Sequence, residues 1–149
     1  IGKGQLLPEM QRLASDMGLK NINFIDRFMK EEELTRYIEQ ADICLGIFGE
    51  TEKALRVIPC KVYNCLVMGK PLITAKTPAI EGVLTHMENA FLCKPGDPEA
   101  LSQAIRHLKN DGRLRKKLSN NGKEYFCRNF SIEAIGKRVV HIIENLKDI

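Results

Sequence analysis

The segment from residue 56 to residue 75 constrains the fold of this chain more than any other stretch. Its apolar positions recur at helical spacing, at Val62, Cys65, Leu66 and Gly69. That spacing predicts a helix with one apolar face. Gly69 can end the helix in a left-handed C-cap, Pro71 cannot continue it, and the apolar run 72–75 is typical of a strand. A helix that leads directly into a buried strand is one repeat of a parallel α/β sheet.

The N-terminal end of this helix carries the first candidate binding residues. Pro59 suits the entry to a helix, because its missing N–H is not needed there. Lys61 and Asn64 stand three residues apart and share a face near that end. The free N–H groups of a helix N-terminus can receive an oxygen-rich ligand. The alternative, which the pattern alone favours, is a half-buried helix with a solvated lysine.

Strand-like runs alternate with helical patterns along the rest of the chain. Strands are predicted at residues 21–25, 42–47, 72–75 and 90–93. Further helices are predicted at residues 8–17, 31–40, 97–108, 112–128 and 131–146. Residues 48–55 are expected to form a polar loop, and residues 80–84 either a helix or a turn. This alternation predicts an α/β fold, a Rossmann-like parallel sheet flanked by helices. The apolar run 42–47 is typical of a parallel strand covered on both faces.

We expect the 149 residues to form a single domain, residues 1–149, with a real hydrophobic core. The glycine turn at residues 2–4 has no complete strand before it, so the sheet is expected to lack its first strand–helix unit. The chain also does not begin with Met. It therefore reads as a fragment of a longer protein.

The charge balance favours some partners over others. The net charge of +4 fits phosphate ligands or an anionic membrane surface, but it is too weak to indicate nucleic acid. The densest basic cluster, between Arg113 and Lys117, is typical of a solvated helix face. Five cysteines without a Cys-x-x-Cys pair indicate a reducing cytosolic compartment. No apolar run approaches the ~20 residues that span a bilayer, and no signal peptide is recognisable.

Several kinds of chemistry find little support. The turn Gly2-Lys3-Gly4 lacks both the third glycine of a dinucleotide fingerprint and the Gly-Lys-Ser/Thr end of a phosphate loop. The three histidines are dispersed and no Asp-x-Asp pair exists, so no metal site is expected. No Gly-x-Ser-x-Gly elbow is present. Glu81, before Gly82, could accept hydrogen bonds from sugar hydroxyls or be a solvated carboxylate, and His86 is a further candidate for a ligand contact.

Taken in order, these segments resemble the C-terminal domain of retaining, two-Rossmann-domain (GT-B) glycosyltransferases of family 4, the group 1 type. The resemblance covers essentially the whole chain. It is carried by residues 1–4 (Ile-Gly-Lys-Gly), 21–25 (Asn-Ile-Asn-Phe-Ile), 33–42, 58–71 and 88–101. Within residues 58–71, the order Ile-Pro-x-Lys…Gly-Lys-Pro is similar to the family's central helix, and residues 95–101 are similar to its Pro-Gly-Asp-Pro-Glu-Ala-Leu sequence.

The resemblance implies a domain that binds a nucleotide-diphospho-sugar donor, with no cofactor and no metal needed. A separate N-terminal domain would supply a glycan or lipid-linked acceptor. Such an enzyme would work in polysaccharide biosynthesis, in the cytoplasm or as a peripheral protein at the inner face of the membrane. It would not bind nucleic acid. The donor-binding residues that it implies are Arg27, Phe28, Arg56, Ile58, Pro59, Lys61, Asn64, Glu81 and Gly82. Gly2 and Gly4 would form a turn on the phosphate side.

Two positions depart from the family pattern. Asn64 stands where the resemblance places a ribose-binding glutamate, and Arg56 stands where it often places an acid that touches the donor sugar. A neutral amide binds hydroxyls more weakly than a carboxylate, whereas Arg56 could pair with the diphosphate. We therefore expect little or no activity from the chain alone. The alternative function is a degenerate, non-catalytic domain of the same fold that serves binding or assembly.

Overall fold

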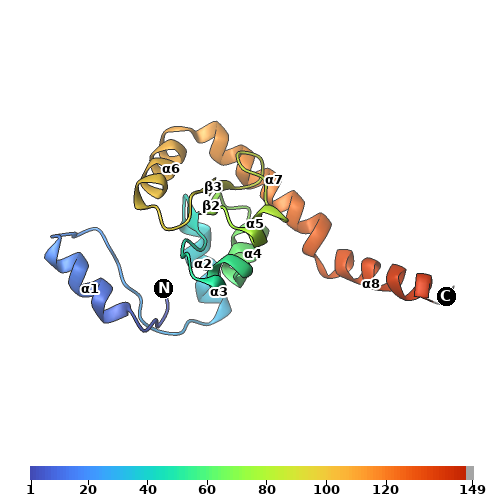
Figure 1. Ribbon diagram of the computed structural model, residues 1–149, viewed down its shortest axis with the longest axis horizontal. Helices are drawn as coiled ribbons and strands as arrows, with labels where there is room; N and C mark the ends of the chain where they lie inside the picture. The colour runs from blue at the N-terminus through green and yellow to red at the C-terminus, as the bar shows by residue number, and fades with distance from the viewer. Residues whose placement is uncertain (147–149) are drawn as a thin grey trace. The chain divides into compact units, whose positions relative to one another are not determined.

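The computed structural model describes residues 1–146 (Figure 1). Its contacts divide the chain into two compact units, Ile1–Tyr37 and Ile38–Ile149. Helix α2 (Glu31–Gln40) crosses the boundary between them and begins with three glutamates, as the helix dipole favours. The single domain expected over residues 1–149 stays a prediction.

The first unit contains helix α1 (Leu7–Asp16) and an irregular segment that leads to α2. Gly18 ends α1 with a φ of 65°, and the N–H of Leu19 returns to the carbonyl of Ala14 at 2.9 Å. The predicted strand at residues 21–25 is wrong. Among the described residues, a single backbone bond, from Gly2 N to Ile25 O at 2.8 Å, joins this segment to residues 1–4, and one bond does not make a ladder.

The second unit is built on a parallel sheet of three strands, which confirms the predicted α/β class. The strands are β1 (Cys44–Leu45), β2 (Leu72–Ala75) and β3 (Phe91–Cys93), in the order β1-β2-β3. Cys44 is opposite Leu72, and Ile73 is opposite Phe91. The middle strand therefore has a partner on each side.

β1 is shorter and less covered than the run 42–47 predicted. Beyond Leu45 the chain still follows β2, because Gly46 N bonds to Ile73 O at 2.8 Å. Ala75 N then donates to Ile47 O at 2.9 Å. The hydroxyl of Thr74 adds to this pairing, because it accepts from Ile47 N at 3.2 Å and donates to Ile47 O at 3.3 Å. Leu45 is 43% exposed, because β1 forms an edge of the sheet and is not covered on both faces.

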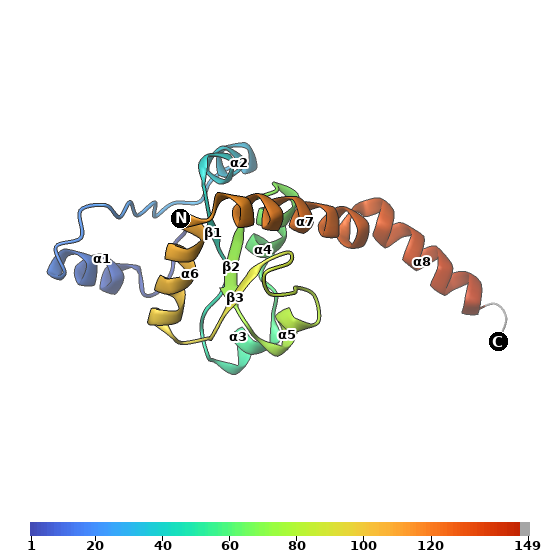
Figure 2. The same cartoon turned by 90° about the horizontal axis from the view of Figure 1, so that it is seen from above.

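Leu72 and Ile73 of β2 point to opposite faces of the sheet, where each belongs to a different apolar cluster. Helix α4 (Cys60–Val67) covers one face and helix α6 (Pro98–Asn110) covers the other, as Figures 1 and 2 show. The first cluster comprises Val62, Cys65, Leu66, Leu72, Ile80, Leu84, Ala90 and Leu92. The second comprises Ile73, Cys93, Ala104, Leu108, Leu114 and Leu118.

Helix α7 (Gly112–Phe130) joins the two clusters. Leu114 and Leu118 belong to the cluster under α6, whereas Tyr125 and Phe126 pack against the cluster under α4. Gly122 lets α7 approach closely, because an added Cβ would lie 3.0 Å from the Leu66 side chain. The last helix, α8 (Ile132–Leu146), continues away from the sheet and buries none of its residues (Figure 2).

Two short helices were not fully anticipated. Helix α3 (Glu52–Arg56) lies within the predicted polar loop at residues 48–55, which is therefore wrong in part. Thr51 caps α3 by accepting from Ala54 N at 3.2 Å, and this bond stabilises a helix of only five residues. For residues 80–84 the sequence left a helix and a turn as alternatives. The structure has a helix, α5 (Pro78–Glu81), which begins two residues before this segment.

Gly46 tests the close contact between β1 and β2. An added Cβ there would lie 2.6 Å from the Cβ of buried Thr74. We expect Gly46→Ala to lower the free energy of unfolding by about 1–3 kcal/mol, because neither strand can move away. Urea denaturation monitored by circular dichroism would measure this. In the matched control Gly136→Ala, the added methyl meets open space on α8, and no loss of stability is expected. Equal effects of the two substitutions would contradict the prediction.

Candidate functional site

Three helix ends meet the carboxyl edge of the sheet in the second unit. Because β1 and β2 are parallel, the segments that follow them emerge at the same edge. α3 follows β1 and α5 follows β2, and the two helices lie side by side beyond that edge (Figure 2). α4 begins there too, since its other end leads through Pro71 into the start of β2. Ligands of open α/β sheets bind at this kind of edge.

The end of α3 presents a pair of opposite charges. Glu52 and Arg56 are one helical turn apart, and their carboxylate and guanidinium groups lie 3.4 Å from each other. Both side chains are largely solvated, at 86% and 76% exposure. Exposed pairs of this kind contribute at most about 1 kcal/mol, so a ligand can replace the pairing at little cost.

The start of α5 faces this charged pair. Thr77 caps α5 by accepting from Ile80 N at 3.3 Å, and Pro78 occupies the first turn. Thr77 is buried although polar, so this bond fixes the position at which α5 begins. Glu81 ends α5 and pairs with Lys76 at 3.1 Å. Its carboxylate is thus occupied by a cation of the same segment.

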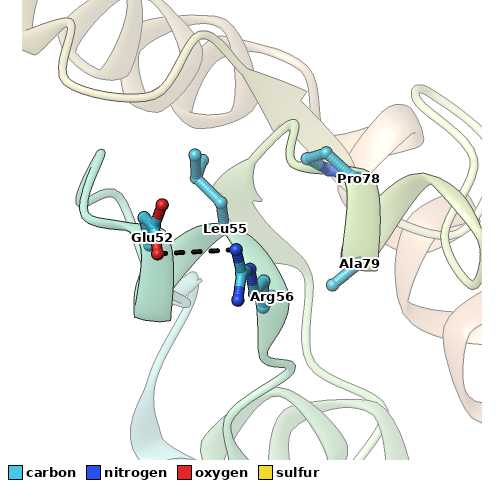
Figure 3. Close-up of a pocket in the computed structure, with 5 residues that line it drawn as sticks. All are labelled: Glu52, Leu55, Arg56, Pro78 and Ala79. Carbon is cyan, nitrogen blue, oxygen red and sulfur yellow. Dashed lines mark ion pairs between the residues drawn. The ribbon is translucent and has the colours of Figure 1, made fainter.

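A cavity of about 500 Å³ lies between the two helices. Glu52, Leu55 and Arg56 line it from α3, and Pro78 and Ala79 line it from α5. Figure 3 shows the Arg56 guanidinium turned toward Glu52, with Pro78 and Ala79 on the facing ribbon. The cavity therefore combines one acid, one base and an apolar wall, within the volume range of small-molecule sites.

The N-terminus of α4 adds a positive end to the same edge. Its N-cap residue is Pro59, which makes no side-chain cap bond. Lys61 stands in the first turn, where a cation opposes the helix dipole. Partial burial lowers the pKa of the Lys61 amine, and proximity to Cys65 only partly offsets this. An uncapped helix start beside a lysine is a suitable place for an anion.

The other residues of the predicted donor site fall into two groups. In the second unit, Asn64 is half-buried on α4, Ile58 packs against the apolar cluster beside it, and Gly82 is the C-cap of α5. Their predicted contacts with a donor stay predictions. The remaining four, Gly2, Gly4, Arg27 and Phe28, all lie in the first unit.

Within the first unit, Arg27 forms a salt bridge with Glu33 that lowers the pKa of this carboxyl group. Phe28 beside it is 87% exposed. An exposed aromatic ring is free to stack on a planar ligand. That role for Phe28 is still a prediction.

His86 has a structural role. Its Nδ1 accepts a hydrogen bond from Leu92 N at 3.0 Å, and its ring packs edge-on against Phe91. Burial lowers the pKa of this imidazole, which favours the neutral form that can accept. It also lies before β3, at the edge opposite the cavity. In residues 1–146, no group of three His, Cys, Asp or Glu side chains could hold a metal ion.

Four residues of the cavity were missed by the sequence analysis, namely Glu52, Leu55, Pro78 and Ala79. A local signal was present for each helix, because Thr51 and Thr77 are threonines placed directly before a short helical stretch. What the local pattern does not contain is the contact between the two helices, which only the sheet brings about.

Comparison with known proteins identifies the chain's relatives. The family model described as glycosyl transferases group 1 matches residues 1–125. The chain belongs to this family. In this family member the parallel sheet carries a charged cavity at its carboxyl edge.

Curated relatives match this group 1 family chain over part of their length. The amylovoran biosynthesis glycosyltransferase AmsK of Erwinia amylovora is 25% identical over 109 residues, which are 72% of this chain and 27% of AmsK. The lipopolysaccharide core biosynthesis glycosyltransferase LpsD of Rhizobium meliloti is 39% identical over 67 residues, which are 45% of this chain and 20% of LpsD. The chain thus covers about a quarter of the first relative and a fifth of the second.

Solved structures share the fold of this chain. Sucrose-phosphate synthase of Thermosynechococcus elongatus superposes with a TM-score of 0.78 at 19% identity, over 99% of this chain and 37% of that one. Anabaena Alr3699/HepE, solved in complex with UDP-glucose, gives a TM-score of 0.77 at 18% identity, over 93% and 36% of the two chains. The chain therefore has the fold of one half of a GT-B glycosyltransferase, consistent with the C-terminal half.

Lys61 gives a prediction about pH and stability. Its folded pKa lies below the ordinary value of 10.5, so the charged amine is less favourable in the folded protein than in the unfolded chain. This penalty is complete below the lowered pKa and disappears as pH rises to about 10.5. We therefore expect Lys61→Met to raise the free energy of unfolding at pH 7, with a smaller gain near pH 10 in urea denaturation.

The matched control is Lys53→Met, which removes an exposed lysine of α3. It should change the unfolding free energy little and equally at both pH values. A Lys61→Met protein that is less stable than the native chain at pH 7 would show that the amine is not desolvated.

Proposed function

We propose that this chain is the donor-binding half of a retaining, metal-independent glycosyltransferase, which moves a sugar from a nucleotide-diphospho-sugar to a glycan or lipid-linked acceptor. The observation that carries the proposal is the carboxyl edge of the sheet, where a cavity of about 500 Å³ lies at the same edge as the uncapped start of α4. Membership of the group 1 family supports the transferase chemistry. HepE, solved with UDP-glucose, supports a nucleotide sugar as the donor.

The start of α4 is proposed to hold the diphosphate. Lys61 supplies a full positive charge, and the backbone N–H groups of the first turn supply donors. In sugar transfer the bond between the anomeric carbon and the diphosphate oxygen breaks, and its electron pair stays on that oxygen. A fixed positive end at this oxygen stabilises the charge as it develops. Stabilisation of this kind needs no metal ion, so no cofactor is proposed.

The other contacts with the donor are proposed from the resemblance to the family. Asn64 lies one helical turn beyond Lys61 and is proposed to bind the ribose hydroxyls through its amide. Arg27 and Phe28 are proposed to contact the base, and the turn at Gly2 and Gly4 to approach the phosphates. Glu81 is proposed to reach a sugar hydroxyl once it leaves its pairing with Lys76.

The acceptor side is proposed to come from another domain, since the chain covers little more than a third of the solved relatives. Lipopolysaccharide core biosynthesis by LpsD supports a role in polysaccharide assembly. A cytoplasmic enzyme that associates peripherally with the inner face of the membrane would fit such an acceptor. No helix within residues 1–146 is long and apolar enough to cross a membrane.

Thermal unfolding with a panel of nucleotides tests the donor site. A ligand at 100 times its dissociation constant adds about 2.7 kcal/mol of stability. For a chain of this size we expect the melting temperature to rise by roughly 5–10 °C with the correct nucleotide diphosphate or nucleotide sugar. Nucleosides without phosphate serve as the control. If no nucleotide diphosphate or nucleotide sugar shifts the transition, the proposed function is wrong.

Asn64→Glu tests the ribose contact. A carboxylate accepts from both ribose hydroxyls with charge assistance, so we expect nucleotide affinity to rise about tenfold in calorimetric titrations. Asn120→Glu places the same new charge on an exposed position of α7 and should leave affinity unchanged. Unchanged or weaker binding by the Asn64 variant would mean that the ribose is held elsewhere.

A non-catalytic binding or assembly domain is the second candidate function. The identities of Asn64 and Arg56 favour it, because neither supplies the carboxylate expected at its position. Turnover distinguishes the two functions. The chain would be joined to an N-terminal acceptor domain and supplied with the donor. Release of a nucleotide diphosphate is then expected only if the chain is part of an enzyme.

A further inference from the structure

We propose that the cavity between α3 and α5 selects a donor whose sugar carries a carboxylate, that is, a nucleotide-activated uronic acid. Arg56, which lines the cavity, is the residue that would bind this carboxylate. The inference rests on the proposed function and names the class of sugar that the site takes.

The guanidinium of Arg56 has N–H donors that are available to a ligand. It offers five N–H donors in a planar fork, and its ion pair with Glu52, at 3.4 Å through one nitrogen, is too long for a hydrogen bond. That pair is solvent-exposed, so a ligand can displace or share it at little cost. The fork matches a carboxylate with two parallel hydrogen bonds, whereas a hydroxymethyl group offers it a single oxygen. A uronic acid therefore gains more from Arg56 than the corresponding neutral hexose.

The other cavity residues suit the rest of a sugar ring. Leu55, Pro78 and Ala79 form an apolar wall against which the C–H face of a pyranose can pack. The Glu52 carboxylate has two oxygens that accept hydrogen bonds from ring hydroxyls. The cavity thus offers a partner for three parts of one uronic acid. The apolar wall fits the ring face, Glu52 accepts from the hydroxyls, and the Arg56 guanidinium binds the carboxylate.

The diphosphate is a less suitable partner for Arg56. Arg56 ends α3, and the extended residues Val57 and Pro59 separate it from the first turn of α4. Lys61 and the N–H groups of that turn already provide positive charge for the diphosphate. The cavity residues, in contrast, include Arg56 but neither Lys61 nor Asn64. We therefore assign Arg56 to the sugar.

The test compares matched donors on the purified chain. UDP, UDP-glucose and UDP-glucuronate are titrated calorimetrically, and GDP-mannose with GDP-mannuronate gives a second pair. We expect each uronate donor to bind roughly five- to tenfold more tightly than its neutral partner. This preference should shrink in ~1 M salt, where the Debye length falls to about 3 Å.

Three variants assign the preference to Arg56. Arg56→Gln should abolish the preference for uronate donors while UDP binds as before. Lys53→Gln removes a positive charge from the same helix outside the cavity and should keep the preference. Glu52→Gln removes the carboxylate that competes for Arg56 and should increase the preference for uronate over neutral donors, because both donors lose the same hydroxyl contact. Circular dichroism spectra and melting temperatures confirm that each variant folds.

The outcomes separate this inference from the proposed function. Binding of nucleotides without any preference for uronates would overturn the inference and leave the proposed function standing. Weaker binding of UDP itself by the Arg56→Gln variant would also overturn it, since Arg56 would then hold the diphosphate. If no nucleotide or nucleotide sugar binds the chain, both proposals are wrong.

Discussion

The structure of the second unit depends on the complete burial of one four-residue strand, β2. None of its side chains is measurably exposed, and its first two residues, Leu72 and Ile73, belong to different apolar clusters. Each full burial of a leucine or isoleucine contributes roughly 1.5–3 kcal/mol. Because both faces must be covered at once, α4 and α6 take opposite sides of the sheet, and α7 has to contact both clusters.

The site follows from the same constraint. A strand buried on both faces and paired on both edges leaves only its ends accessible. At the carboxyl end, Thr77 is buried and uses its hydroxyl to start α5, so the wall of the cavity is positioned by the core. The opposite wall, α3, is a short exposed helix that carries a solvent-exposed ion pair. The cavity therefore joins a rigid face to a more adaptable one.

Local signals in the sequence predicted the helix and strand boundaries that are set by the residues at the boundary itself. Asp97 and Pro98 predicted the start of α6, where the Asp97 carboxylate accepts from Ala100 N at 3.0 Å. Gly69 and Pro71 likewise predicted where α4 ends and β2 begins. These residues determine backbone geometry directly, so no distant contact is needed to recognise them.

Features that depend on distant partners were not predicted. The alternating run 21–25 looks like a strand, but a strand forms only where a neighbour completes its ladder. Beyond the end of β1, Ile47 binds the hydroxyl of Thr74, which lies 27 residues further along the chain. Arg56 was a predicted donor-binding residue and lines the cavity, but its neighbours Pro78 and Ala79 come from another crossover. Their proximity is a property of the sheet, and the local sequence does not contain it.

The absence of buried residues from α8 has a consequence for local stability. An isolated helix of 15 residues is marginal in water, and α8 gains little from the core that stabilises β2. Its backbone hydrogen bonds can therefore open without the rest of the second unit, whereas those of β2 open only when both clusters come apart. The chain thus combines a cooperative centre, which exchanges its amide protons slowly, with a C-terminal helix that unravels and reforms on its own timescale.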